Sequence, residues 1–221
     1  MNRAKMISFD LDGTITDISF ADSVWLEGIP RSFADKTGVS LEEAKRRVIG
    51  EYAEVGRDRL EWYDLRYWIG KLCLDVRPEE LLDSFQHKIK IYPEVIEVLE
   101  EFSSMGFRLI VVSNARREFV DLELQKTKIV RYFERVYSAT SDFGLIKNMV
   151  ELYWRICKIC DVSPNEVIHV GDDRIFDFEV PSRLGINSFY LDRTGKETGE
   201  YVVHSLKELS GKRANGTSNT R

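Results

Sequence analysis

The sequence predicts an α/β protein, and two observations lead to this prediction. From residue 91 onward, short apolar runs alternate with helical patterns, as in a parallel sheet covered on both faces by helices. Residues 17–87, in contrast, contain helical patterns alone. We therefore expect a three-layer, Rossmann-like core made of residues 1–16 and 88–210, an inserted all-helical cap domain at residues 17–87, and a flexible, apolar-poor tail at residues 211–221.

The first strand and the cap each carry local signals. Lys5 to Phe9 is an apolar run followed by Asp10-Leu11-Asp12-Gly13-Thr14, which predicts a buried strand and then a turn. In the cap, Ser40 and Glu43 form a capping-box pattern at the start of a helix. Pro78 suits the first turn of a later helix.

The remaining chain completes the core. Its apolar runs predict strands near residues 107–112, 135–137, 167–170, 187–191 and 201–203. Its helical patterns predict helices near residues 93–105, 116–126, 146–160 and 176–184. Pro181 lies inside the last of these helices, so that helix is expected to start late or to kink.

Charge and composition exclude several classes of protein. The net charge of -5 disfavours general nucleic-acid binding. No stretch approaches the ~20 apolar residues that span a bilayer, so no membrane partner is expected. The N-terminus lacks a secretory pattern, and three cysteines do not make a disulfide framework, which together favour a cytoplasmic location.

Four polar clusters each follow a predicted strand or the loop after one. The clusters are Asp10/Asp12/Thr14, Ser113/Asn114, Lys147 and Asp172/Asp173/Asp177. Because the carboxyl ends of parallel strands face one crevice, these clusters are expected to meet there. Carboxylates can hold Mg²⁺, a serine hydroxyl and a lysine can hold phosphate oxygens, and a carboxylate can attack phosphorus.

These motifs resemble those of the haloacid dehalogenase (HAD) superfamily. Residues 10–14 match its first motif, DxDxT, while Ser113 and Lys147 match the second and third. Gly171-Asp172-Asp173 with Asp177 matches the fourth. The resemblance spans residue 5 to about residue 209, and the helical insertion resembles the C1 cap of that superfamily.

The resemblance implies roles for the reactive residues. Asp10 corresponds to the nucleophile and a metal ligand. Asp12 corresponds to the general acid/base, with its main-chain carbonyl also on the metal. Lys147 is expected to bridge Asp10 and the phosphoryl group, and Asp172 to be the second metal carboxylate.

Further residues are expected to support this centre. By the same resemblance, Ser113 and Asn114 contact phosphate, and Thr14 supports the loop after the first strand. Asp177 corresponds to a partner of the metal's waters. The role of Asp173 is open between a ligand, an electrostatic role and helix capping.

Two positions depart from the family pattern, and three further residues are expected to have structural roles. Asn148 stands where proline is frequent and Ala115 where glycine is frequent, and neither change removes a reactive group. Cys157, Cys160 and His169 lie in apolar surroundings and are expected to be structural.

The function expected from the resemblance is a Mg²⁺-dependent phosphatase. Its substrate is a small phosphorylated metabolite, such as a sugar phosphate or phosphoglycolate, and a cap that excludes water suits this chemistry. A phosphomutase, a 2-haloacid dehalogenase and a non-catalytic metal- or phosphate-binding regulator remain as alternatives. The sequence determines neither the particular substrate nor the oligomeric state.

Overall fold

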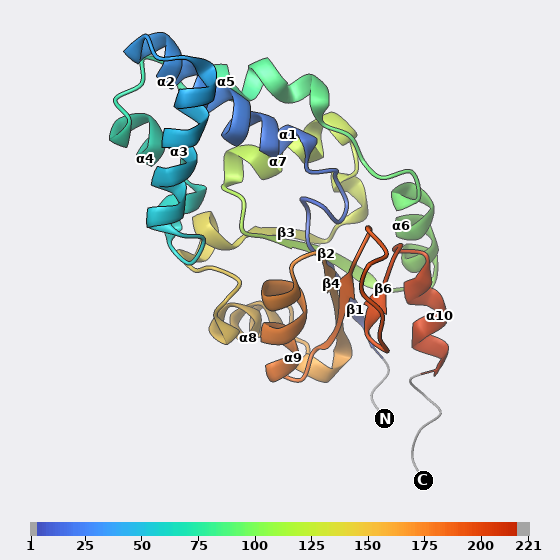
Figure 1. Cartoon of the computed structure of the whole chain (residues 1–221). Coiled ribbons are helices and arrows are strands. Elements are labelled where there is room, and N and C mark those ends of the chain that lie inside the picture. The colour runs from blue at the N-terminus through green and yellow to red at the C-terminus, as the bar shows by residue number, and fades with distance from the viewer. Residues whose placement is uncertain (1–3, 216–221) are drawn as a thin grey trace.

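A six-stranded sheet forms the centre of the molecule (Figure 1). The structure is a computed structural model that describes residues 4–215. The strand order is β3-β2-β1-β4-β5-β6, and every neighbouring pair is parallel. The strands are β1 (Met6–Phe9), β2 (Arg108–Ser113), β3 (Arg135–Ser138), β4 (Val167–Gly171), β5 (Asn187–Leu191) and β6 (Val202–Val203).

Each face of the sheet is buried under helices, which gives the expected three layers. Successive strand residues alternate between two apolar clusters: Ile7 and Phe9 belong to one, and Met6 to the other. Helices α6, α7 and α10 cover the first face, and α8 and α9 cover the second. These helices are α6 (Val95–Ser104), α7 (Arg117–Thr127), α8 (Val150–Ile159), α9 (Val180–Arg183) and α10 (Glu208–Asn215).

Every element between β1 and α6 is helical, as the sequence predicts. These elements are α1 (Ser19–Ser23), a π-helix (Val24–Gly28), α2 (Ile29–Thr37), α3 (Leu41–Val55), a 3-10 helix (Leu60–Tyr63), α4 (Leu65–Lys71), α5 (Pro78–Phe85) and a 3-10 helix (Gln86–Lys88). They share an apolar cluster centred on Trp68, which also includes Phe119 of α7. The cap therefore has its own small core and rests on one helix of the sheet domain.

Two helices of the cap begin where the sequence predicts. The Ser40 hydroxyl accepts a hydrogen bond from the Glu43 amide at the start of α3, which is one half of the expected capping box, while the Glu43 carboxylate pairs with Arg46 and Arg47. Pro78 is the first residue of α5. Within residues 4–215, no helix is both long and apolar enough to cross a membrane.

The structure corrects three expectations. Helix α10 continues to Asn215, so residues 211–215 are helical and do not belong to a flexible tail; residues 216–221 lie outside the described residues. Helix α8 begins at Val150 instead of near residue 146, because a turn first carries Lys147 toward the sheet. The expected helix at 176–184 is a π-helix (Arg174–Glu179) that leads into α9, with Pro181 in the first turn of α9.

Three further short helices connect the core elements. They are 3-10 helices at Val130–Tyr132 and Pro164–Glu166, and a π-helix at Ala139–Phe143.

Candidate active site

The turn after β1 places Asp10 at the carboxyl end of the sheet. Asp10 is buried, and its amide donates to the carbonyl of Val170 on β4 over 2.9 Å. The chain then turns through Gly13, whose φ of +78° is strained for any residue with a side chain. The guanidinium of Arg193, in the segment after β5, donates to the carbonyls of Gly13 and Thr14 over 3.1 and 2.6 Å. These two bonds fix the turn.

Two glycines let the carboxylates approach the backbone. A Cβ atom at Gly13 would collide with the carboxylate of Asp172, and a Cβ atom at Gly171 would collide with that of Asp177. Both glycines therefore belong to the site, because the acidic side chains occupy the space that their own side chains would fill.

Lys147 connects two of the acids. Its side chain is only 2% exposed, and its ammonium forms ion pairs with Asp10 and, over 2.5 Å, with Asp177. Burial by itself would lower the pKa of Lys147, but Asp10 and Asp177 together raise it well above the usual range. The lysine is therefore a fixed positive charge beside the Asp10 carboxylate.

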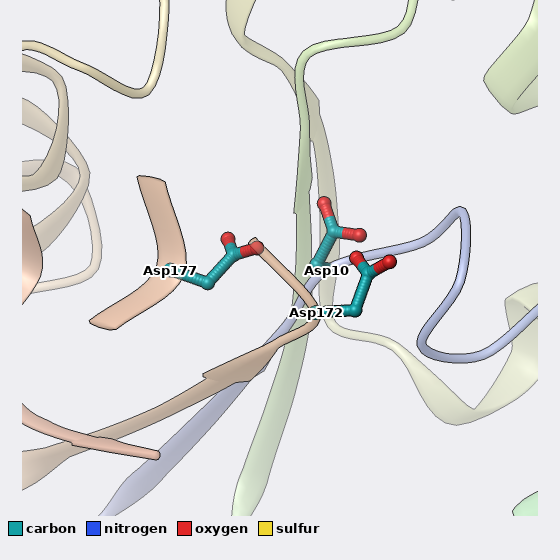
Figure 2. Close-up of side chains that lie close together, drawn as sticks. All are labelled: Asp10, Asp172 and Asp177. Atoms are coloured by element: carbon teal, nitrogen blue, oxygen red, sulfur yellow. The ribbon is translucent and has the colours of Figure 1, made fainter. Parts of the chain in front are cut away.

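Asp10, Asp172 and Asp177 form an acidic group (Figure 2), with one carboxylate oxygen of each within 4.8 Å of the others. Burial raises the pKa of Asp10 well above its usual value. Burial and, after it, the charge of Asp177 raise the pKa of Asp172 to about 7. Clustered, hard oxygen donors whose ionised forms repel one another fit a small divalent cation, which favours those forms.

Asp12 has a different environment from the acidic group. One of its side-chain oxygens is buried and, among the described residues, has no hydrogen-bond partner. Burial raises the pKa of Asp12 to about 6, so it can hold a proton close to neutral pH. Its neighbour is Glu123 of α7, which is also buried, and burial together with the charge of Asp12 raises the pKa of Glu123 well above its usual value.

Ser113 and Asn114 lie in the loop after β2, and several bonds fix this loop. The Ser113 hydroxyl accepts from the Ala115 amide over 3.0 Å, and the Asn114 side chain accepts from the Lys147 amide over 2.9 Å. The Asn114 amide group also donates to the Tyr63 hydroxyl of the cap over 3.3 Å. One asparagine thus joins the second motif, the third motif and the cap.

The two acids after Asp172 differ in their contacts. Asp173 caps the following π-helix by accepting from the Ile175 and Phe176 amides, and it pairs with Arg57 of the cap over 2.5 Å. Asp177 accepts from the Asp173 amide over 3.0 Å and lies 3.0 Å from His169 Nε2. Burial alone would raise the pKa of Asp177, but Lys147 and His169 lower it to about 2.

A cavity of about 570 Å³ lies above these groups, between the sheet and the cap. Its floor contains the acidic group with Asp12, Ser113, Asn114 and Lys147. Its cap-side wall is largely apolar and includes Trp25, Leu26, Ile49 and Trp62. The site is therefore a polar floor under an apolar roof.

The structure brings almost all of the predicted site residues to this floor. Asp10, Asp12, Ser113, Asn114, Lys147, Asp172, Asp173 and Asp177 all line the cavity. Thr14 does not line it: its side chain is fully buried behind the turn, and its hydroxyl has no partner among the described residues.

Sequence reasoning missed four residues that shape the site. They are Arg57, Tyr63, Glu123 and Arg193, and none of them belongs to a sequence motif. Each reaches the site from an element distant in sequence, so periodicity and spacing hold no signal for it. His169 is fully buried, as expected, but it also bonds Ser8 over 2.8 Å and orients Asp177.

Fold and site together define a class: hydrolases with a parallel-sheet core, an aspartate after the first strand and an inserted helical cap. The model of the family described as "haloacid dehalogenase-like hydrolase" matches residues 4–180. The chain therefore belongs to the haloacid dehalogenase-like hydrolases, and it is a phosphohydrolase of that family.

Three similar proteins illustrate the range of this family. A phosphoglycolate phosphatase of Vibrio vulnificus (strain CMCP6) is 31% identical over 228 residues, which cover 91% of this chain and 89% of that protein. The GMP/IMP nucleotidase YrfG of Escherichia coli (strain K12) is 23% identical over 193 residues, covering 87% and 84%. The crystal structure of a HAD phosphatase from Thermococcus onnurineus matches with a TM-score of 0.84 and 28% identity, covering 94% of this chain and 96% of that one.

Proposed function

We propose that this protein is a Mg²⁺-dependent phosphatase that hydrolyses a small phosphomonoester, with Asp10 as the nucleophile. One observation carries this proposal: a buried Asp10 carboxylate at the cavity floor, between Lys147 and Asp172, with Asp12 two residues further along the chain. The phosphatases among the similar proteins support it, since they act on phosphoglycolate and on GMP and IMP.

In the first step, an Asp10 oxygen attacks phosphorus and the bond from phosphorus to the alcohol oxygen breaks. Asp12 gives its proton to the departing oxygen, which leaves as an alcohol. Lys147 stays charged and offsets the negative charge that collects on the transferred group. The Ser113 hydroxyl and the backbone of the Asn114 loop hold the phosphoryl oxygens.

In the second step, water attacks phosphorus and the bond to Asp10 breaks, which releases inorganic phosphate. Asp12, now ionised, takes the proton from that water. Asp10 and Asp172, with the main-chain carbonyl of Asp12, are the ligands proposed for Mg²⁺, which supplies positive charge beside the transferring group. Asp177 pairs with Lys147, and Thr14 is buried behind the turn after β1. Both are proposed to hold the ligands in place.

We also propose that residues 17–87 move as a unit over a core made of residues 1–16 and 88–210. The two connecting segments are hydrogen-bonded to each other: the Asp17 amide donates to the Lys90 carbonyl, and the Tyr92 amide to the Ile15 carbonyl. A block whose apolar cluster meets the core at Phe119 and Leu122 of α7, and whose two connections are adjacent, can pivot about that contact as one body. The closed cap excludes water from the transfer.

The test is phosphate release from a panel of phosphomonoesters, with and without Mg²⁺, by the wild type and by Asp10→Asn. We expect release by the wild type with Mg²⁺ and none above background by Asp10→Asn. Isomerisation of a sugar phosphate without net phosphate release would identify a phosphomutase instead. Metal-independent halide release from a 2-haloacid would identify a dehalogenase, and inactivity in all three assays would leave a regulatory role.

A further inference from the structure

The cap-side wall of the cavity carries apolar side chains that water contacts. Ile18, Leu26 and Ile49 are 46%, 40% and 48% exposed, and all three line the cavity. Rings of Trp25, Tyr52 and Trp62 stand among them. When an apolar ligand group covers surface of this kind and removes it from water, the free energy of the complex falls.

Among the described residues that line the cavity, no cation is left unpaired for a second acidic group of the substrate. Among its described lining residues, the cations are Arg57, Arg116 and Lys147. Arg57 pairs with Asp173 and lies over the Phe176 ring at 4.5 Å, and Arg116 pairs with Asp64 of the cap. Lys147 is held by Asp10 and Asp177 at the floor.

Charge on the cap side also disfavours a second anion. Besides the paired Arg57, the charged side chain that the cap contributes to the lining is that of Asp22, which would repel a carboxylate or a second phosphate on the substrate. A substrate such as phosphoglycolate, which carries a carboxylate beside its phosphate, has no partner for that carboxylate in the described lining.

Hydroxyl groups of a sugar find few partners at the same wall. The Tyr52 hydroxyl donates to the Trp25 carbonyl over 3.0 Å, and the Tyr63 hydroxyl donates to the Arg57 carbonyl over 3.0 Å. Desolvating a hydroxyl without a replacement hydrogen bond costs free energy. Apart from the Asp22 carboxylate, which can accept from one or two hydroxyls, this wall therefore offers a polyhydroxylated alcohol few groups to replace its bound water.

We infer that the substrate is a phosphomonoester with one acidic group, whose alcohol carries an apolar, ring-bearing body that packs under the cap against Ile18, Leu26 and Ile49. This inference rests on the proposed phosphatase function and narrows its substrate class away from sugar phosphates and phosphoglycolate. The phosphate binds at the polar floor of the cavity, and the apolar body binds against its apolar cap-side wall.

The first test compares primary alkyl phosphates, which share one kind of leaving oxygen, on the wild-type enzyme with Mg²⁺. We expect kcat/KM for 2-phenylethyl phosphate to exceed that for 2-phosphoglycolate and for glucose 6-phosphate by about 10-fold or more, the scale of burying one ring. A preference for either polar ester overturns the inference and leaves the phosphatase function intact. No phosphate release from any ester overturns both.

The second test places a positive charge on the cap-side wall of the cavity. Ile49→Lys adds an unpaired cation at an exposed position of α3, so we expect kcat/KM to fall for 2-phenylethyl phosphate and to rise for 2-phosphoglycolate. The expected change in their ratio is about 10-fold or more. The matched control is Ile159→Lys, because Ile159 is also 48% exposed and does not line the cavity. An equal change of the ratio in both variants, or none in Ile49→Lys, overturns the inference.

Discussion

At the scale of single residues, Asp12 carries the proton chemistry of the proposed reaction. An alkoxide is a strong base, so its departure requires a proton from a nearby acid. We predict that Asp12→Asn lowers steady-state turnover of alkyl phosphates by about 10²-fold or more. An ester with an acidic leaving group suffers less in the first step, because its leaving oxygen needs no proton. Steady-state phosphate release from both kinds of ester measures this difference.

Asp161→Asn is the control for this substitution, since Asp161 is exposed and lies in the turn after α8. It makes the same change of functional group outside the cavity and should leave turnover unchanged. Near-normal turnover of alkyl phosphates by Asp12→Asn is incompatible with Asp12 as the general acid.

Gly171 has a steric role that a second substitution tests. A Cβ atom there meets the Asp177 carboxyl group, so Gly171→Ala must displace Asp177 and disturb its pair with Lys147. We predict a loss of stability of about 1–3 kcal/mol, the usual cost of overpacking, together with reduced activity. Denaturant unfolding and phosphate release measure the two effects.

Gly50→Ala is the matched control, because nothing lies within 4 Å of a Cβ atom at Gly50 in helix α3. There the same change should be neutral or stabilising, since alanine favours a helix over glycine. Equal stability of Gly171→Ala and wild type would show that Asp177 has room to shift.

The sequence predicted that the residues proposed to react lie together, because they stand at strand ends. Asp10, Ser113 and Asp172 each follow an apolar run, and topology alone brings such positions together. Glu123 and Arg193 were not predictable. One lies on the buried side of α7 and the other beyond β5, and their contact with the turn after β1 exists only in three dimensions.

At the scale of elements, reciprocal contacts hold the cap on the core. Arg57 of the cap pairs with Asp173, Arg116 of the core pairs with Asp64, and the Asn148 side chain donates to Asp58 over 3.2 Å. These polar contacts surround the cavity and can break and form again as the proposed pivot opens and closes.

We predict that Asp64→Asn makes the cap open more often. The asparagine keeps the side-chain oxygen that caps α4 through the Arg66 and Tyr67 amides, but it loses the charge that pairs with Arg116. Hydrogen exchange in the connecting segments, residues 15–17 and 88–92, should quicken by about two- to fivefold, the scale of one partly exposed ion pair.

Asp75→Asn provides the comparison, because Asp75 is highly exposed and pairs with Lys36 inside the cap. It removes the same charge without touching the interface and should leave exchange in these segments unchanged. Identical exchange in Asp64→Asn and the wild type argues against a pivoting cap held by this pair.

The order and type of elements followed from the sequence, whereas several boundaries did not. Strands such as β2 and β4 are mostly apolar and buried on both faces, with Arg108 and His169 as the charged or titratable exceptions, and this is a strong signal. Tertiary contacts set the boundaries that the sequence did not predict. The turn before α8 delivers Lys147 to Asp10, and the π-helix after Asp173 leads into Pro181, whose ring limits how an α-helix can continue. Leu209, packed in the core, anchors α10, whose last residues carry little apolar character of their own.

At the scale of the whole molecule, a divalent ion bound at the acidic group, as proposed above, would link activity and stability to its concentration. We predict that chelation abolishes phosphate release and that Mg²⁺ restores it. Ca²⁺ should restore it poorly, since its larger and looser coordination misplaces the nucleophile.

Mg²⁺ should also raise the melting temperature, because a ligand that binds only the folded state stabilises it. The gain is about 2.7 kcal/mol at a concentration of 100 times Kd. Asp172→Asn should lose most of this thermal shift while remaining folded. Full activity after exhaustive chelation, or an equal shift in Asp172→Asn, contradicts a metal held by Asp10 and Asp172.

The most direct test of the account is to locate the phosphoryl group during the reaction. Asp12→Asn, mixed with an ester of an acidic leaving group such as 4-nitrophenyl phosphate, should form the aspartyl phosphate faster than it hydrolyses it, because water then lacks its base. Acid quenching and mass spectrometry of the peptides should find the phosphoryl group on Asp10 in most molecules. Phosphate release with no phosphoryl group on Asp10, or with one on another residue, would contradict Asp10 as the nucleophile.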